Sequence, residues 1–462
     1  MSAERDAAAC VFPSFPGFEP PDWIRRAFDR GLGGVVLFGW NCGEGLAGLN
    51  AALRAEQPDV LIAIDEEGGD VTRLEADMGS SYPGNHALGV VDDVDLTERV
   101  AESIAADLAA VGINLDLAPV ADVNTNPRNP IVGVRSFGST GELVARHVAA
   151  FVRGLQRNGV AACAKHFPGH GDTELDSHLE LPTAAGDLEE ALLPFRAAIE
   201  AGVRSIMTAH IRVPELDDQP ATVSRAILHD LLREKLGYDG LVITDALEMR
   251  GLSGTVGVEQ GAVQAIAAGA DALCLGHDLG QEALVNVERA LVGAVRGGRL
   301  EEQRLGEAAE RVRRLQGLCN RLLQSPQRRP DGELGLAAAR RAVEIDGAVA
   351  LDRPAVVVQL LPEANIAAGE FRHSLAELLG AEAAGPDLAA TDGRQLVIVL
   401  RDAHRHEWAR RKTEELLEAA PDSIVVETGL PVWRPRAAAY LATHGSGRVN
   451  LAAAAELLRG PA

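Results

Sequence analysis

The chain has 462 residues, a length that favours two domains, or one large barrel with an extension, over a single core of ordinary size. Apolar residues make up 47% and charged residues 24%, the balance of a folded globular protein, which argues against a disordered scaffold. The formal net charge of −23 argues against nucleic acid or an anionic membrane surface as the main partner.

Three features of the sequence bear on its compartment. The first 23 residues contain acidic side chains and early prolines, without the basic head and apolar run of a secretory signal. No stretch approaches the roughly 20 apolar residues that a membrane-spanning helix requires. The five cysteines are scattered, without Cys-x-x-Cys spacing, and are expected to be free thiols. We therefore expect a cytoplasmic protein that does not bind a membrane.

Eight short apolar runs alternate with amphipathic helical stretches before residue 300. In the stretch 96–112, Val100, Ile104, Leu108 and Val111 recur at helical spacing and would cover one face. Apolar strands that are each followed by a helix indicate a parallel sheet with helices outside, and eight such units predict a (β/α)8 barrel of the TIM type. The predicted strands are 9–15, 33–39, 60–67, 113–120, 159–167, 204–210, 240–246 and 271–277.

A second, smaller domain is predicted after the barrel. A helix over 300–324 is expected to end a barrel domain of residues 1–324. Residues 325–335 are polar and interrupted by proline and glycine, which is typical of a linker. A new alternation of strands and helices then indicates an αβα domain over 336–462. The strands predicted in it are 354–361, 395–401 and 423–429.

Polar residues stand at the ends of many predicted barrel strands. Active sites of such barrels lie at this C-terminal face, so the pattern predicts a polar pocket there. A single aspartate at a strand end is, by contrast, often only the cap of the following helix. The strand-end residues are Asp65, Glu66, Glu67, Asp122, Lys165, His166, His210, Asp245 and His277.

The loop 165–182, KHFPGHGDTELDSHLELP, is unusually rich in titratable groups. A metal site is disfavoured, because Phe-Pro-Gly between His166 and His170 prevents the helical register that would place both on one ion. We expect neither a metal nor a cofactor. In an extended backbone Asp176 and His178 lie on the same side, so the carboxylate can orient the imidazole for acid–base work. The alternative is a solvated surface pair.

Asp245 is the candidate nucleophile. It ends a fully apolar strand in GLVITDALEM, on the face that carries Lys165 and His166. A carboxylate in this position can attack a substrate, although it can also simply cap the next helix.

Five blocks in collinear order resemble the glycoside hydrolases of family 3, most closely the bacterial β-N-acetylglucosaminidases. The resemblance extends from residue 10 to about residue 320. It implies that Asp245 is the nucleophile of a covalent glycosyl–enzyme intermediate, His178 the acid/base and Asp176 its orienting partner. The blocks are 64–69, 133–137, 165–182, 207–210 and 243–249. The substrate-binding residues that the resemblance implies are Asp65, Arg73, Asp122, Arg135, Lys165, His166 and His210.

Two positions depart from the family pattern. Asp70 stands where the family usually has an arginine, and Trp40 replaces another arginine after the second strand. Both would alter the rim of the pocket and hence the preference for a leaving group. Trp40 would either stack on a sugar or pack at a corner of the barrel. The smaller domain is expected to have a structural or accessory role.

The predicted function is a cytoplasmic, metal-independent, retaining β-N-acetylglucosaminidase. Its expected substrates are small saccharides with terminal N-acetylglucosamine, such as muropeptide fragments of cell-wall recycling or chitooligosaccharides. The Gly-rich segment 169–171 suggests a mobile loop that carries His178. The alternatives are a β-glucosidase or N-acetylglucosamine phosphorylase of the same family, or a sugar-binding protein that has lost catalysis.

Overall fold

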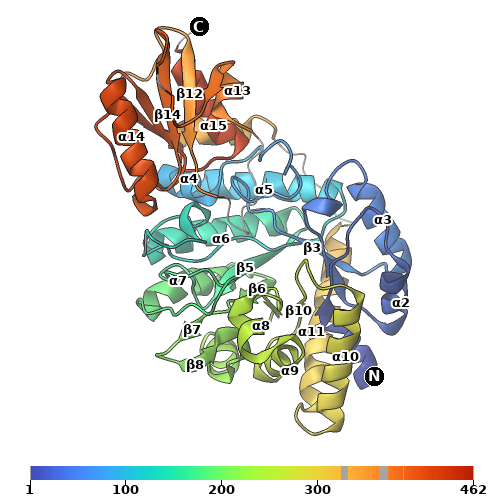
Figure 1. The fold of residues 1–462 in the computed structure, drawn as a ribbon. Coiled ribbons are helices and arrows are strands. Elements are labelled where there is room, and N and C mark those ends of the chain that lie inside the picture. Colours follow the sequence, from blue (N-terminus) through green and yellow to red (C-terminus); the bar gives the residue numbers. More distant parts are fainter. Residues whose placement is uncertain (1, 324–330, 364–372, 389, 461–462) are drawn as a thin grey trace.

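The computed structural model describes residues 2–323, 331–363, 373–388 and 390–460. Eight parallel strands form the barrel (Figure 1), and each lies inside one of the eight ranges predicted from the sequence, which confirms that fold. The strands are β1 (Val11–Phe12), β2 (Gly34–Val36), β3 (Leu61–Ile64), β4 (Leu115–Asp116), β5 (Ala161–Phe167), β6 (Ser205–Thr208), β9 (Leu241–Thr244) and β10 (Leu273–Cys274).

The strand order follows the chain around the barrel. Strands β2, β3, β4, β5, β6 and β9 pair side by side, and β1 pairs with β10. Backbone hydrogen bonds link these sheets into a ring. On one side Val36 N donates to Pro13 O at 3.0 Å, and on the other Thr244 N donates to Ala272 O at 2.9 Å. Because side chains alternate along a strand, Leu61 and Ala63 fill the barrel while Ile62 packs against the helices.

Helices surround the barrel and bury one face each. In α5, the residues Val100, Ile104 and Leu108 of the predicted apolar face are buried, while Val111 is half-buried at the C-terminal end. The outer helix between β6 and β9 is a π-helix, η4. The main outer helices are α2 (Asp22–Arg30), α3 (Leu46–Glu56), α5 (Val94–Ala110), α6 (Gly141–Arg157), α7 (Leu188–Glu200), η4 (Ala226–Lys235), α9 (Val258–Ala268), α10 (Gln281–Arg296) and α11 (Glu302–Leu323).

The second domain has the three layers that the sequence predicts. Its sheet has the order β11-β16-β15-β14-β12-β13, with only β11 antiparallel to its neighbour. Val357 packs with helices α13 and α15 on one face, whereas Val356 packs with α14 on the other. The elements are β11 (Glu344–Gly347), β12 (Ala355–Leu360), α13 (Leu375–Leu379), β13 (Glu382–Ala384), β14 (Gln395–Leu400), α14 (Glu407–Ala419), β15 (Ile424–Glu427), β16 (Ala439–Ala442) and α15 (Arg448–Arg459).

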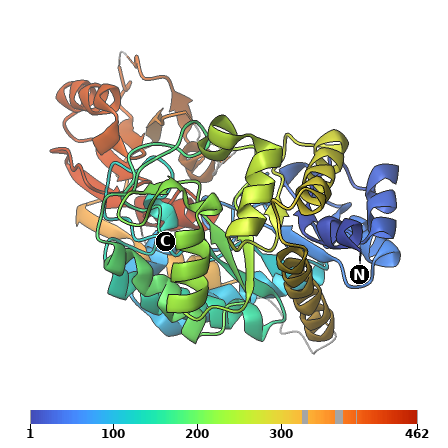
Figure 2. The same cartoon turned by 90° about the horizontal axis from the view of Figure 1, so that it is seen from below.

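The two domains meet beside α4 (Asn85–Val91) and α12 (Leu334–Ala342), opposite the N-terminal helices of the barrel (Figures 1 and 2). Helix α12 packs against α4 of the barrel and α15 of the smaller domain. It begins inside the predicted linker 325–335, most of which lies outside the described residues, so the exact domain boundaries stay a prediction. Within the described ranges, no helix is both long and apolar enough to span a membrane.

Candidate active site

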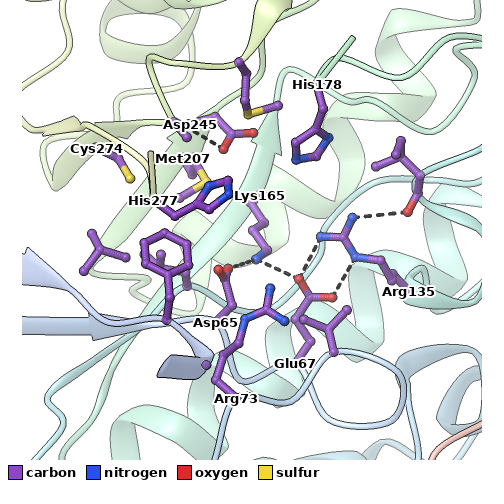
Figure 3. A pocket seen from close by; sticks show the side chains of 18 of the residues that line it. Asp65, Glu67, Arg73, Arg135, Lys165, His178, Met207, Asp245, Cys274 and His277 are labelled. Carbon is purple, nitrogen blue, oxygen red and sulfur yellow. Dashed lines mark hydrogen bonds and ion pairs between the residues drawn. The ribbon is translucent and has the colours of Figure 1, made fainter. Parts of the chain in front are cut away.

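A cavity of about 660 Å³ opens at the C-terminal ends of the barrel strands (Figure 3). Its walls come from the loops that follow β2, β3, β5, β9 and β10 and from the 3-10 turn η2 (Gly133–Arg135). Among the described residues of the smaller domain, His373 also lines it. Of the residues predicted to form the site, those that line this cavity are Asp65, Arg73, Arg135, Lys165, His166, His178 and Asp245.

The inner end of the cavity is a chain of four alternating charges. Lys165 Nζ donates to Asp65 Oδ1 at 2.6 Å and lies 2.7 Å from Glu67 Oε1. Arg135 binds the same Glu67 carboxylate through two hydrogen bonds of 2.8 and 2.9 Å. Lys165 and Glu67 are each 2% exposed, so these charges are fixed in position before a ligand enters.

These contacts set the ionisation of the network. Burial acts to raise the pKa of Glu67, but the charges of Arg135 and Lys165 hold it well below its usual range. Burial acts to lower the pKa of Lys165, and the carboxylates of Asp65 and Glu67 raise it above its usual value. Glu67, Arg135 and Lys165 are therefore charged at neutral pH, and together they can bind the hydroxyl groups of a sugar.

Two predicted binding residues lie behind the cavity wall. Asp122 is fully buried and accepts hydrogen bonds from the backbone of His166 and His170, while one of its oxygens lies 2.7 Å from His166 Nδ1. His210 is also buried, with Nδ1 2.7 Å from Thr222 Oγ1 and Nε2 2.9 Å from the carbonyl oxygen of Ala246. Both therefore position residues that face the cavity and do not line it themselves.

Asp245 follows β9 and faces the cavity from the side opposite Glu67 (Figure 3). Burial acts to raise its pKa, yet the nearby imidazoles of His166, His210 and His178 and the backbone N–H of Ala246 lower it. The carboxylate is thus ionised at neutral pH, as a nucleophile must be.

His178 reaches the same cavity from the loop after β5 (Figure 3). Its Nδ1 lies 2.8 Å from Asp176 Oδ1, which also accepts the His178 backbone N–H at 2.8 Å. Burial acts to raise the pKa of Asp176, but the hydrogen bonds and charge of His178 lower it. The free nitrogen of a ring oriented through Nδ1 is Nε2, which is then available for proton transfer.

Hydrogen bonds hold this loop against its surroundings. His170 contacts Thr173 Oγ1 at 2.7 Å and Ser177 Oγ at 3.0 Å through its two ring nitrogens. Backbone N–H groups of Arg250 and Gly251, which follow Asp245 along the chain, donate to the carbonyls of His178 and Ser177. The loop that carries the predicted acid/base is thereby joined to the segment that carries the predicted nucleophile.

The histidines and aspartates of the loop 165–182 each have a different partner, so within the described part of the chain they do not gather as metal ligands. One group with metal-ligating side chains does occur at the mouth of the cavity: Glu248, His277 and Asp278. The Glu248 carboxylate accepts the backbone N–H groups of His277 and Asp278, so this group shapes the turn after β10.

Sequence reasoning placed Glu67 among the strand ends of the predicted pocket but did not name it as a binding residue. Asp65 and Glu67 share the side-chain direction of an i, i+2 pair, which could have indicated this role. Sequence reasoning also missed His373, a residue of the smaller domain that lines the cavity. Asp70, which departs from the family pattern, pairs with Arg401 of that domain at 2.7 Å and accepts hydrogen bonds from the backbone and the hydroxyl of Ser446. Its carboxylate is thus engaged at the domain junction.

A (β/α)8 barrel with a charged cavity at the C-terminal ends of its strands has the architecture of a barrel enzyme. The model of the glycosyl hydrolase family 3 N-terminal domain matches residues 25–315, and the chain belongs to this family of glycoside hydrolases. Membership confirms the resemblance predicted from the sequence.

Relatives with known names support this assignment. Beta-hexosaminidase A of Pseudoalteromonas piscicida is 33% identical over 388 residues, and the match covers 74% of this chain but only 64% of that protein. Beta-hexosaminidase of Chromobacterium violaceum is 40% identical over 253 residues, covering 52% of this chain and 70% of that protein. The structure of a glycoside hydrolase family 3 beta-N-acetylglucosaminidase from Paenibacillus sp. str. FPU-7 has a TM-score of 0.88 at 32% identity, covering 100% of this chain and 97% of that one.

Proposed function

We propose that the protein is a retaining glycoside hydrolase that removes terminal β-linked N-acetylglucosamine from small saccharides. The observation that carries this proposal is the placement of Asp245 and His178 on one cavity, with the Lys165–Glu67–Arg135 network at its inner end (Figure 3). Relatives named beta-hexosaminidase and beta-N-acetylglucosaminidase support the choice of sugar.

In the first step, Asp245 attacks the anomeric carbon of a sugar held by the inner network. His178 Nε2 donates its proton to the glycosidic oxygen, the bond between this oxygen and the anomeric carbon breaks, and a glycosyl ester forms on Asp245. Asp176 holds the imidazole ring in place and stabilises its charged form.

In the second step, neutral His178 takes a proton from water while the water oxygen attacks the anomeric carbon. The ester bond breaks, Asp245 regains its charge, and the sugar leaves with its original anomeric configuration. A neutral imidazole does not repel an anion, so phosphate can take the place of water in this step. With phosphate as the acceptor, the protein would be a phosphorylase. A cytoplasmic location and a role in cell-wall recycling stay predictions.

The test is NMR spectroscopy of the first product formed from a β-N-acetylglucosaminide, in phosphate and in phosphate-free buffer. We expect free N-acetylglucosamine of β configuration in both buffers. The α anomer as first product would contradict the glycosyl–enzyme intermediate, and a sugar phosphate would identify the phosphorylase. The β-glucoside analogue is the control for sugar choice, since faster cleavage of it would contradict the proposed substrate.

A further inference from the structure

The mouth of the cavity carries three aromatic rings that the proposed mechanism does not use. The rings of Phe38, Trp40 and His277 contact one another in all three pairs, with centroids 5.7 to 5.8 Å apart and tilts of 33° to 50°. Phe38 and Trp40 follow β2, His277 follows β10, and all three line the cavity. Figure 3 shows His277 across the cavity from Arg135. We name these three rings the aromatic platform.

The platform is held in place by hydrogen bonds on two sides. Asn41, which is fully buried, donates through Nδ2 to the carbonyls of Phe15 and Gly17 and accepts the backbone N–H of Phe38. This fixes the turn η1 (Gly39–Asn41) on which Trp40 stands. On the other side, Glu248 Oε1 lies 2.8 Å from His277 Nδ1 and accepts the backbone N–H of His277. Two independent anchors therefore set the rings before any ligand binds.

The exposure of the platform differs from that of the inner end. Trp40 is 40% exposed, whereas Lys165 and Glu67 are 2% exposed. An anchored aromatic side chain that lines a cavity and is open to solvent is suited to binding a ligand. Because the inner end binds the terminal sugar, any leaving group has to extend toward this open mouth.

The chemistry of the platform fits a sugar ring. The face of an aromatic ring is negatively polarised and packs against the C–H groups of a pyranose, while neighbouring polar groups bind the hydroxyls. Glu248 and Asp278 supply such polar groups next to His277, and Arg250 lines the same cavity.

We infer that the aromatic platform is the binding site for the leaving group and that it selects leaving groups that are themselves pyranose rings. The inference rests on the proposed function and extends it from the sugar that is cleaved off to the one that departs. It assigns Trp40 as the residue that determines this specificity.

The test compares two substrates that share the terminal sugar. N,N′-diacetylchitobiose has a pyranose leaving group, and methyl β-N-acetylglucosaminide has a leaving group without a ring. In Trp40→Ala, the ratio of kcat/KM for the disaccharide to kcat/KM for the methyl glycoside should fall about tenfold, mainly through KM. Trp40→Phe keeps a ring and should restore most of the ratio. Trp408→Ala, which removes an exposed tryptophan of the smaller domain, is the matched control and should leave the ratio unchanged.

A ratio that Trp40→Ala leaves unchanged, whether both substrates slow equally or neither slows, would overturn the inference. If the wild-type protein cleaves neither substrate, the proposed function fails, and the platform is then tested by binding. Quenching of tryptophan fluorescence by N,N′-diacetylchitobiose should persist in Trp408→Ala and disappear in Trp40→Phe. Equal quenching in both variants, or none in the wild type, would contradict the platform independently of catalysis.

Discussion

The two sides of the cavity are built differently. The inner end consists of side chains at or next to strand ends, with Lys165 and Glu67 2% exposed and bound to several partners. The side proposed for the acid/base consists of one imidazole, that of His178, which is 22% exposed. It lies on a loop that extends eleven residues past β5, and one carboxylate orients it. Groups that bind a sugar can be rigid, whereas a group that transfers protons in two directions has to remain reachable by water.

The largest loss of activity is expected from substitution of Asp245, the proposed nucleophile. Asp245→Ala should lower turnover by about 10⁴-fold or more, because neither a bound sugar nor a proton donor compensates for a missing nucleophile. Steady-state kinetics with thermal unfolding as a check on folding would measure this. Asp218→Ala, on an exposed hairpin, is the control. Substantial turnover in Asp245→Ala would place the nucleophile elsewhere.

A smaller and more selective effect is expected on the acid/base side. His178→Ala should slow disaccharide cleavage by about 10²- to 10⁴-fold, because a sugar leaving group needs a proton. An activated phenol leaves as the anion, so the formation of the glycosyl ester from a nitrophenyl glycoside should slow far less. Pre-steady-state measurement of phenol release separates these steps. Equal losses with both leaving groups would mean that His178 does not donate the proton.

Substitution of two neighbouring glutamates tests how much the charge network at the inner end contributes to the stability of the protein. Glu67→Gln removes the charge shared by Lys165 and Arg135 and should lower the free energy of unfolding by about 3 kcal/mol at pH 7. Glu66→Gln should cost less than about 1 kcal/mol, since an amide oxygen can still accept the backbone N–H groups of Arg73 and Leu74. Urea denaturation of both variants and the wild type measures the difference.

The two glutamates should contribute to the free energy of unfolding with opposite dependence on pH. The folded-state pKa of Glu67 is lowered, so its contribution is complete above the unfolded value of about 4.3 and is lost as the pH falls below it. Burial raises the pKa of Glu66 to about 7, so the wild type loses stability as the pH rises from about 4.3 to 7. The stability of Glu66→Gln should therefore increase relative to that of the wild type over this pH range. Parallel plots of unfolding free energy against pH for the two variants would contradict this assignment.

The sequence predicts the fold well because apolar runs and helical spacing are local signals. The Asp176–His178 contact is also local, since two residues in an extended segment determine it. By contrast, adjacent Glu66 and Glu67 look alike in sequence, although their pKa values shift in opposite directions. Burial dominates at Glu66 and raises its pKa, whereas the charges of Arg135 and Lys165 outweigh burial at Glu67 and lower it. A position at a strand end likewise does not say whether a side chain faces the cavity, and Asp122 lies behind the wall.

The contact of Asp70 with Arg401 and Ser446 has a consequence for any attempt to work with the barrel alone. In the whole chain this carboxylate is almost completely shielded and its counter-ion comes from the other domain. A shortened protein that stops after α11 would leave an orphaned anion three positions from Glu67, in a segment that lines the cavity. Redesign of the barrel as a stand-alone unit should begin by replacing that aspartate.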